Sequence, residues 1–261
     1  MGTMTFLDAK QRFSNRVADY VRYRPGYSAA VLDLLRAECG LRPGHIIADI
    51  GSGTGLLSEL FLKNGNRIYG VEPNKEMREA GEEYLASYDG FSSIEGSAEF
   101  TTLGDFSIDF VTAGQAFHWF EKEKTRTEFR RILRGKGWVV AVWNFRDKEA
   151  PFGRAYEDIL VKYGTDYMRV RESYPDGHDM KAFFLVGEFF ERTLPNDRPL
   201  NWDGLAGLLR SASYMPQETH ANFSPMMNAL RELFLGHQEN GSVSMKYTTR
   251  MYFGQLQPGG N

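Results

Sequence analysis

The sequence predicts an α/β fold in which a mostly parallel sheet carries helices on both faces. Short apolar runs alternate with amphipathic helical patterns at a regular rhythm between residues 46 and 143, as in strands joined by crossover helices. The first of these apolar runs also ends in a cluster of glycines that opens the next helical pattern. Such a turn lets a ligand approach the backbone closely, which is why α/β proteins use it at binding sites.

The elements of the first half follow from periodicity and from the residues that break it. Residues 12–39 have a helical pattern that is interrupted at Arg24-Pro25-Gly26, because the residue before a proline favours extended backbone. A helix from Leu56 ends at Gly65, and a helix over 121–133 ends at Gly135-Lys136-Gly137. One more helix is expected over 74–87, and strands are expected over 46–50, 67–72, 92–96, 108–113 and 138–143.

The second half has longer helical stretches between fewer strands. Residues 150–182 are mostly helical in pattern and rich in tyrosine and charge. Further helices are expected over 203–211 and 226–237, and strands over 189–194 and 242–253. We therefore expect the same sheet to be completed by these two strands, with a helical cap inserted over about 150–237.

Composition limits the function classes that remain. Of 261 residues, 42% are hydrophobic and 25% charged, which excludes a mainly disordered chain. The 31 Lys and Arg against 34 Asp and Glu leave a net charge of -3, which argues against a nucleic-acid partner. One cysteine, Cys39, excludes an internal disulfide framework, and the five histidines lack metal-ligand spacing, so no metal is expected.

The sequence also bears on location. The longest apolar cluster, Ala182–Phe190, is interrupted by Gly187 and Glu188 and is far too short to span a membrane. Residues 1–10 lack the apolar core of a signal peptide. With the low cysteine content, these features predict a cytoplasmic protein without a membrane partner.

The glycine cluster is the strongest chemical signal. Asp49-Ile50-Gly51-Ser52-Gly53-Thr54-Gly55 has glycine at every second position, and Leu56 stands where a nicotinamide-type fingerprint needs its third glycine. No Lys-Ser or Lys-Thr pair follows, which excludes a P-loop. Glu72 ends the second expected strand, 17 residues beyond Gly55, where a carboxylate can accept hydrogen bonds from ribose hydroxyls.

These residues resemble the motifs of class I S-adenosylmethionine-dependent methyltransferases. The glycine cluster is similar to their first motif, Glu72 to their ribose-binding acid, and Gly96-Ser97-Ala98-Glu99 to their adenine-contacting segment. The stretch 109–120 resembles their fourth strand and the loop after it, and 131–138 the following helix-turn-strand, with Lys136 where the family often has proline. Residues 115–120 and 20–27 are similar to the type 11 branch, which includes trans-aconitate methyltransferase-like proteins.

The resemblance implies a doubly wound, Rossmann-like sheet of seven mostly parallel strands with helices on both faces. It further implies an N-terminal helical segment over the cofactor and one methyltransferase domain over 1–261. Within that domain, about 40–145 would bind the cofactor and about 150–237 the substrate. The implied cofactor is S-adenosyl-L-methionine, which leaves as S-adenosyl-L-homocysteine. The cofactor-binding residues that the resemblance implies are Tyr20, Arg24, Asp49, Gly51, Ser52, Gly53, Gly55, Glu72, Pro73, Met77, Ser97, Ala98, Glu99, Gln115, Ala116, Phe117 and Trp119.

Roles within this set stay open at several positions. His118 is the candidate catalytic base, with a purely structural place in the pocket wall as the alternative. Phe117 and Trp119 either contact the ligand or pack in the core, and Asp49 either orders the glycine loop or reaches the cofactor's amino group. By residue type, the candidates for the acceptor side of the site are Tyr163, Tyr167, Arg169, Arg171, Tyr174, Arg210 and Tyr214.

The expected reaction is methyl transfer by in-line displacement to a small-molecule acceptor, at a carboxylate or hydroxyl oxygen. A carboxylate acceptor needs cationic partners, and a hydroxyl needs a base. The alternatives are a cofactor-binding protein without catalysis, an NAD-dependent oxidoreductase, and a methyltransferase for RNA or protein. Leu56 counts against the oxidoreductase, and the net charge and the loop 114–117 count against base methylation. A monomer or homodimer without nucleic acid is expected.

Overall fold

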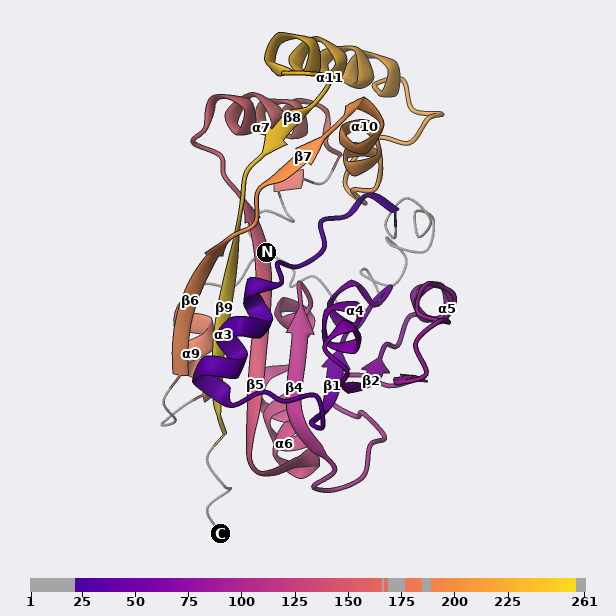
Figure 1. Ribbon diagram of the computed structural model, residues 1–261. Coiled ribbons are helices and arrows are strands. Elements are labelled where there is room, and N and C mark those ends of the chain that lie inside the picture. Colours follow the sequence, from indigo (N-terminus) through magenta and orange to yellow (C-terminus); the bar gives the residue numbers. More distant parts are fainter. Residues whose placement is uncertain (1–21, 166, 169–176, 185–188, 257–261) are drawn as a thin grey trace.

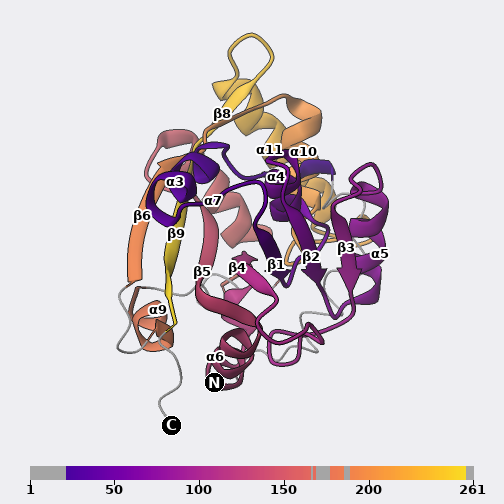
Figure 2. The ribbon, with the colours of Figure 1, turned by 60° about the horizontal axis from the view of Figure 1, so that its bottom comes forward.

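The computed structural model describes residues 22–165, 167–168, 177–184 and 189–256. Across these residues, seven strands form one sheet in the order β3-β2-β1-β4-β5-β9-β6 (Figures 1 and 2). Neighbours from β3 to β5 pair in parallel, and β9 pairs antiparallel with both β5 and β6. The mostly parallel seven-stranded sheet is thereby confirmed. The strand bounds are β1 Ile46–Ile50, β2 Arg67–Val71, β3 Phe91–Ile94, β4 Ile108–Gly114, β5 Leu133–Arg146, β6 Phe189–Pro195 and β9 Tyr247–Gln255.

Helices cover both faces of the sheet, as Figure 2 shows. Helices α3 (Ala30–Cys39) and α4 (Leu56–Lys63) pack on one face, and α6 (Lys122–Ile132) and α9 (Gly177–Phe184) on the other. Helix α5 (Lys75–Tyr84) contacts the edge strand β3. The central strands β1 and β4 are buried over most of their length because both faces of the sheet are covered there.

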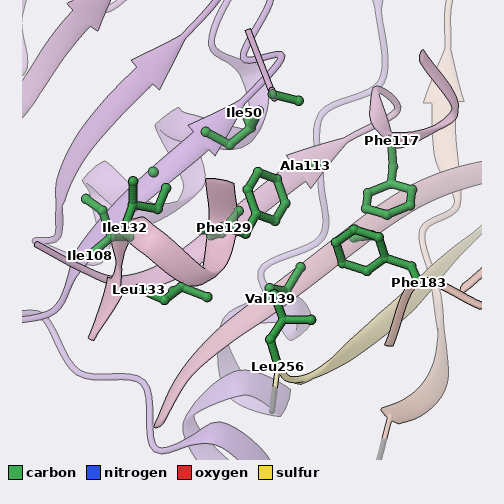
Figure 3. Packing of buried hydrophobic residues seen from close by; sticks show 14 of the residues in the cluster. Ile50, Ile108, Ala113, Phe117, Phe129, Ile132, Leu133, Val139, Phe183 and Leu256 are labelled. Carbon is green, nitrogen blue, oxygen red and sulfur yellow. The ribbon is translucent and has the colours of Figure 1, made fainter. Parts of the chain in front are cut away.

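The face under α6 and α9 holds an aromatic cluster that Figure 3 shows at close range. The ring of Phe117 meets that of Phe183 edge-on, with centroids 4.7 Å apart, and Phe183 also meets Phe129 at 6.0 Å. All three side chains are buried. Each buried aromatic of this kind contributes about 1.5–3 kcal/mol, so this cluster fixes α6, α9 and the segment after β4 to one another.

The cap stands beyond the ends of β5 and β9 at the top of Figure 1. It consists of α7 (Pro151–Tyr163), α10 (Trp202–Arg210), α11 (Phe223–His237) and a short ladder of β7 (Arg198–Leu200) with β8 (Val243–Met245). These elements enclose an apolar core of their own. Their amphipathic faces are therefore satisfied largely against one another, which gives the cap a defined shape above the sheet edge.

The structure corrects several expected elements. Helix α9, which the sequence places in the cap, lies on the sheet, because Phe183 and Phe184 join the sheet's core cluster. Strand β5 extends on both sides of 138–143, and the expected strand 242–253 divides at Lys246 into β8 and β9. Strand β7 was not predicted, since three residues are too few for a period to show. Within the described residues, no helix has the length and apolar character needed to cross a membrane.

Candidate functional site

The carboxyl ends of the parallel strands meet at one edge of the sheet, and a hollow lies there. We call it the loop hollow; its volume is about 110 Å³. One wall is the glycine loop after β1, and the opposite wall is the chain after β4. In open α/β sheets this edge is where ligands bind. The residues that line it are Arg24, Pro25, Tyr27, Asp49, Gly51, Ser52, Gly53, Thr54, Leu56, Leu57, Gly114, Gln115, His118, Trp119, Ser213 and Tyr214.

The glycine loop has the backbone shape that its sequence predicts. Gly51 has φ +66°, and a Cβ there would lie 2.7 Å from Ala116 Cβ. Gly55 has φ +84°, and a Cβ there would lie 2.5 Å from Leu85 Cδ1. A side chain at either position would be strained by the positive φ, and at Gly51 it would also clash with the Cβ of Ala116. The close approach of loop and wall therefore depends on glycine at Gly51.

Asp49 supports this loop from below. Its carboxylate is buried and accepts hydrogen bonds from Ser58 Oγ at 2.7 Å and Thr112 Oγ1 at 3.0 Å. Burial raises the pKa of Asp49 to about 6, and the two hydroxyl groups act in the opposite direction. Asp49 thereby connects the base of the loop to α4 and β4. This arrangement supports the ordering role considered for it from the sequence.

Glu72 stands beside the loop at the end of β2 and is buried. Its Oε2 accepts the backbone N–H of Gly53 at 2.9 Å, and its Oε1 accepts that of Asn74 at 2.8 Å. Burial raises its pKa, and these two hydrogen bonds oppose the rise. Each carboxylate oxygen can accept more than one hydrogen bond, so both keep capacity for ligand hydroxyls. Glu72 itself is not among the described residues that line the loop hollow.

Thr54 and Gln115 each place a buried polar oxygen at the loop hollow. Thr54 Oγ1 and Gln115 Oε1 make no hydrogen bond with any residue that the structure describes. Buried polar groups in proteins are nearly always paired, so orphans at a hollow indicate a polar ligand. A nucleoside-containing cofactor with amino, carboxylate and hydroxyl groups fits this donor and acceptor set.

Gln115 also has an unusual backbone. Its φ is +57°, which is rare for a residue other than glycine. The conformation is fixed by the hydrogen bond from Gln115 N–H to Val142 O at 2.9 Å and from Nε2 to Asn144 O at 3.3 Å. Strained backbone of this kind is characteristic of binding sites, where it aims a side chain.

The 3-10 turn Phe117–Trp119 after β4 (η1) divides the predicted aromatic residues between hollow and core. His118 and Trp119 line the loop hollow, with ring centroids 4.7 Å apart. Burial lowers the pKa of His118 to about 4, so its imidazole is neutral at pH 7. Phe117, which the resemblance implies as a ligand contact, is instead buried in the aromatic cluster below and is not among the described lining residues.

The remaining predicted cofactor residues differ in their surroundings. Ser97 and Phe100 exchange backbone hydrogen bonds, and Glu99 Oε1 accepts the N–H of Glu121 at 2.9 Å, which places this segment at the start of α6. The other side chains are largely packed into the protein. Met77, Ala98 and Ala116 are buried, Ser52 and Pro73 are half-buried, and Tyr20 lies outside the described residues.

A second hollow adjoins the first beneath the cap, and we call it the cap hollow. The two share Arg24, Pro25, Gln115 and Tyr214. Arg24 Nη2 donates to Ser211 O at 3.4 Å, which joins the segment before α3 to the end of α10. The residues that line the cap hollow are Arg24, Pro25, Gln115, Asn144, Phe145, Arg146, Lys148, Tyr156, Tyr167, Leu208, Ala212, Tyr214 and Tyr247.

Of the acceptor-side candidates, the structure brings Tyr167 and Tyr214 to this hollow. Tyr163 and Arg210 are not among the described lining residues, and Arg169, Arg171 and Tyr174 lie outside the described residues. Sequence reasoning missed Tyr27, Thr54, Arg146 and Tyr247. Thr54 lies within the recognised motif, and Arg146 lies three residues beyond the expected end of its strand, so a longer strand would have indicated it.

Comparison with known proteins supports this picture. The family model described as "Methyltransferase domain", type 11, matches residues 48–141, which include the glycine loop, Glu72 and the wall after β4. An "uncharacterized methyltransferase-like" protein of Schizosaccharomyces pombe is 26% identical over 255 residues, 94% of this chain and 96% of that protein. An "uncharacterized methyltransferase" of Geobacillus kaustophilus is 32% identical over 168 residues, 60% of this chain and 75% of that protein.

Other relatives match over a shorter stretch: the alignments cover 59% and 66% of a second Schizosaccharomyces pombe protein and of one from Mycobacterium bovis. A solved structure from Anaeromyxobacter dehalogenans, described as a type II methyltransferase, has the same fold. Its TM-score is 0.62 at 21% identity, and the match covers 91% of this chain and all of that one. With this agreement of motif, topology and relatives, the chain belongs to the type 11 family of class I methyltransferases.

Proposed function

We propose that this chain transfers the methyl group of S-adenosyl-L-methionine to a small-molecule acceptor, at a carboxylate or hydroxyl oxygen. One observation carries the proposal. The glycine loop is hydrogen-bonded to Glu72 and faces a hollow that opens into a second, more polar one. Two adjoining hollows suit two reactants that must meet.

The chemical groups of these residues match those of the cofactor. Glu72 accepts the ribose hydroxyls, as a buried carboxylate at the end of the second strand does in this fold. Thr54 and Gln115 offer the unpartnered polar atoms of the loop hollow. The sulfonium supplies an electrophilic methyl group with a neutral leaving group. The protein therefore gains rate mainly by holding the acceptor in line and excluding water.

The acceptor atom decides whether a base is needed. A carboxylate is already nucleophilic, whereas a hydroxyl must lose its proton. His118 lines the loop hollow and is neutral at pH 7, so its ring is able to accept that proton. The burial that lowers its pKa to about 4 also makes it a weak base. A carboxylate acceptor has no proton to lose, so in that case the imidazole only forms part of the pocket wall.

We also infer the setting of the reaction. The single cysteine, Cys39, and the net charge of -3 favour a cytoplasmic enzyme with a small-molecule partner, without nucleic acid or membrane. We propose that 1–261 act as one domain, as a monomer or homodimer, with the cap determining the acceptor.

The first test is calorimetry of S-adenosylhomocysteine and NADH on the wild type and on Glu72→Ala. We expect micromolar binding of S-adenosylhomocysteine alone, weakened at least tenfold by Glu72→Ala. Glu76→Ala, which removes an exposed carboxylate from the same region, serves as the matched control and should bind normally. Binding of NADH instead would select an oxidoreductase. Turnover would then be compared on a panel of small acids and alcohols and on RNA.

A further inference from the structure

The cap hollow has an unusual set of side chains. It lies where β5 and β9 enter the cap, and its floor contains Arg146 and Tyr247, which are register partners in that strand pair. The charged residues among its lining are Arg24, Arg146 and Lys148, and all three are cations. No described carboxylate lines it.

One carboxylate reaches this group from α7. Glu157 pairs with Arg146 Nη2 and with Lys148 Nζ, the latter at 3.1 Å. It also accepts the hydroxyl of Tyr167 at 2.6 Å. The three lining cations and Glu157 together have a net charge of +2. Such a charge in a half-enclosed space attracts an anion.

Arg146 pairs with Glu157 through only part of its guanidinium. Its side chain is 12% exposed, and its guanidinium lies over the ring of Tyr156 at 4.8 Å. Nη2 is taken by Glu157 and Tyr167, yet Nε donates to no described residue. A buried guanidinium donor without an acceptor is costly, and an anionic oxygen is the acceptor that this fork matches best.

Phenol groups surround the guanidinium. Tyr156, Tyr167, Tyr214 and Tyr247 all line the hollow. The hydroxyl of Tyr167 already donates to Glu157, so the phenols that can donate a hydrogen bond to an anion are those of Tyr156, Tyr214 and Tyr247. The rings of all four give an organic ligand an apolar wall. The combination suits a small organic acid better than a free inorganic ion.

The two hollows have mostly different lining residues. Arg146 lines only the cap hollow, the glycine loop lines only the loop hollow, and Gln115 and Tyr214 line both. A group bound at Arg146 therefore lies beyond the boundary at which the reactants meet. An acceptor that reaches both places must have two functional ends.

We propose that the cap hollow binds an anionic oxygen group of the acceptor, a carboxylate or a phosphate, that is distinct from the atom methylated. The inference rests on the proposed function, because it assigns this group to the methyl acceptor. Arg146 holds the anionic end, and the accepting atom lies at the boundary beside Gln115 and Tyr214. The substrate class is thus a bifunctional small acid.

The test measures anion binding by calorimetry at constant ionic strength on protein saturated with S-adenosylhomocysteine. The probes are glutarate, inorganic phosphate and the neutral glutaramide. We expect glutarate or phosphate to bind and glutaramide not to bind; the tighter anion identifies a carboxylate or a phosphate. Arg146→Gln should weaken the anion at least tenfold, whereas Arg154→Gln, an exposed arginine on α7, should leave it unchanged.

Two results of this titration would overturn the proposal. Absence of anion binding, or equal binding to the wild type and to Arg146→Gln, would overturn the proposal. If Arg146→Gln fails to fold, the Tyr247→Phe variant is used in its place. It should weaken anion binding at least threefold without loss of charge, and an unchanged affinity would overturn the proposal. Repeating the titration without S-adenosylhomocysteine separates the two proposals. Anion binding that depends on Arg146 in a protein that does not bind S-adenosylhomocysteine would leave the hollow's anion site standing and remove the proposed function.

Discussion

The backbone N–H of Gly53 donates to Glu72 Oε2 at 2.9 Å across 19 residues of sequence. The same carboxylate accepts the N–H of Asn74 through its other oxygen. One buried side chain thus fixes the middle of the glycine loop and the start of α5 together. The loop is shaped before any ligand arrives, which reduces the ordering cost of binding.

Glu72→Gln tests this structural role separately from ligand binding. The amide can accept from only one of the two backbone N–H groups, and its own NH2 faces the other. We expect a loss of about 1–3 kcal/mol in the free energy of unfolding, measured by urea denaturation without ligand. Glu76→Gln is the matched control and should lie within about 0.5 kcal/mol of the wild type. Equal stability of the three proteins would contradict the shared role.

Asp49 makes stability depend on pH. Its folded pKa of about 6 lies above the ordinary 3.8, so the fold favours the protonated carboxyl. The stabilising contribution of this carboxyl group to the free energy of unfolding is therefore fully present below about pH 4 and is lost as pH rises through 6. Asp49→Asn is uncharged throughout and escapes the loss. Relative to the wild type, the unfolding free energy of Asp49→Asn should rise by on the order of 2–3 kcal/mol between pH 4 and 7. Above pH 7 the difference between the two proteins should stay constant.

The measurement is the difference in unfolding free energy between wild type and Asp49→Asn at several pH values. Taking the difference cancels the titrating groups that do not interact with Asp49; Glu72 does interact with it, and its effect stays in the difference. A difference that is flat from pH 4 to 8 would show that Asp49 titrates normally. A difference that falls with pH would mean that Ser58 and Thr112 hold the carboxylate ionised.

The buried His118 should affect the turnover rate, kcat, in two ways. Its pKa of about 4 leaves the imidazole neutral at all higher pH values, so kcat should show no inflection near 6.5. With a hydroxyl acceptor, His118→Asn should lower kcat by about a hundredfold, with KM changed little. His220→Asn, which alters an exposed histidine, is the control. A loss below threefold would make His118 part of the wall alone.

The cofactor half was predictable because its signals are local. The run 46–50 is apolar, short and followed by glycines, so strand, turn and helix start follow from a dozen residues. Glu72 falls at the same edge because parallel strands end together. The order of strands and helices in this half follows from alternation and is confirmed, with β5 longer at both ends than expected.

The second half was less predictable because the cap hollow is assembled by tertiary contacts. Asn144-Phe145-Arg146 mixes polar and apolar residues and does not resemble the buried strand that it continues, so Arg146 was missed. Tyr247 reaches the hollow only because β9 pairs antiparallel with β5. For Phe117 the sequence left two alternatives, ligand contact or core packing, and its side chain is buried against Phe183 in the core cluster. Which alternative applies depends on helix packing that no motif encodes.

The last prediction concerns Gly51, where conformation and space act together. With φ at +66° and a Cβ 2.7 Å from that of Ala116, Gly51→Ala adds backbone strain and a clash that no rotamer relieves. We expect it to lose about 2 kcal/mol or more of unfolding free energy and to weaken S-adenosylhomocysteine at least tenfold.

Gly236→Ala is the matched control for that substitution. Gly236 lies in α11 with ordinary helical backbone, and nothing lies within 4 Å of a Cβ there. Alanine is the better helix former, so this variant should gain about 0.5–1 kcal/mol and bind the ligand normally. The same chemical change is therefore expected to have opposite signs at the two positions, measured by urea denaturation and calorimetry. Two losses of equal size would mean that the loop tolerates a side chain, and the close approach of Gly51 to Ala116 would then not be what shapes the hollow.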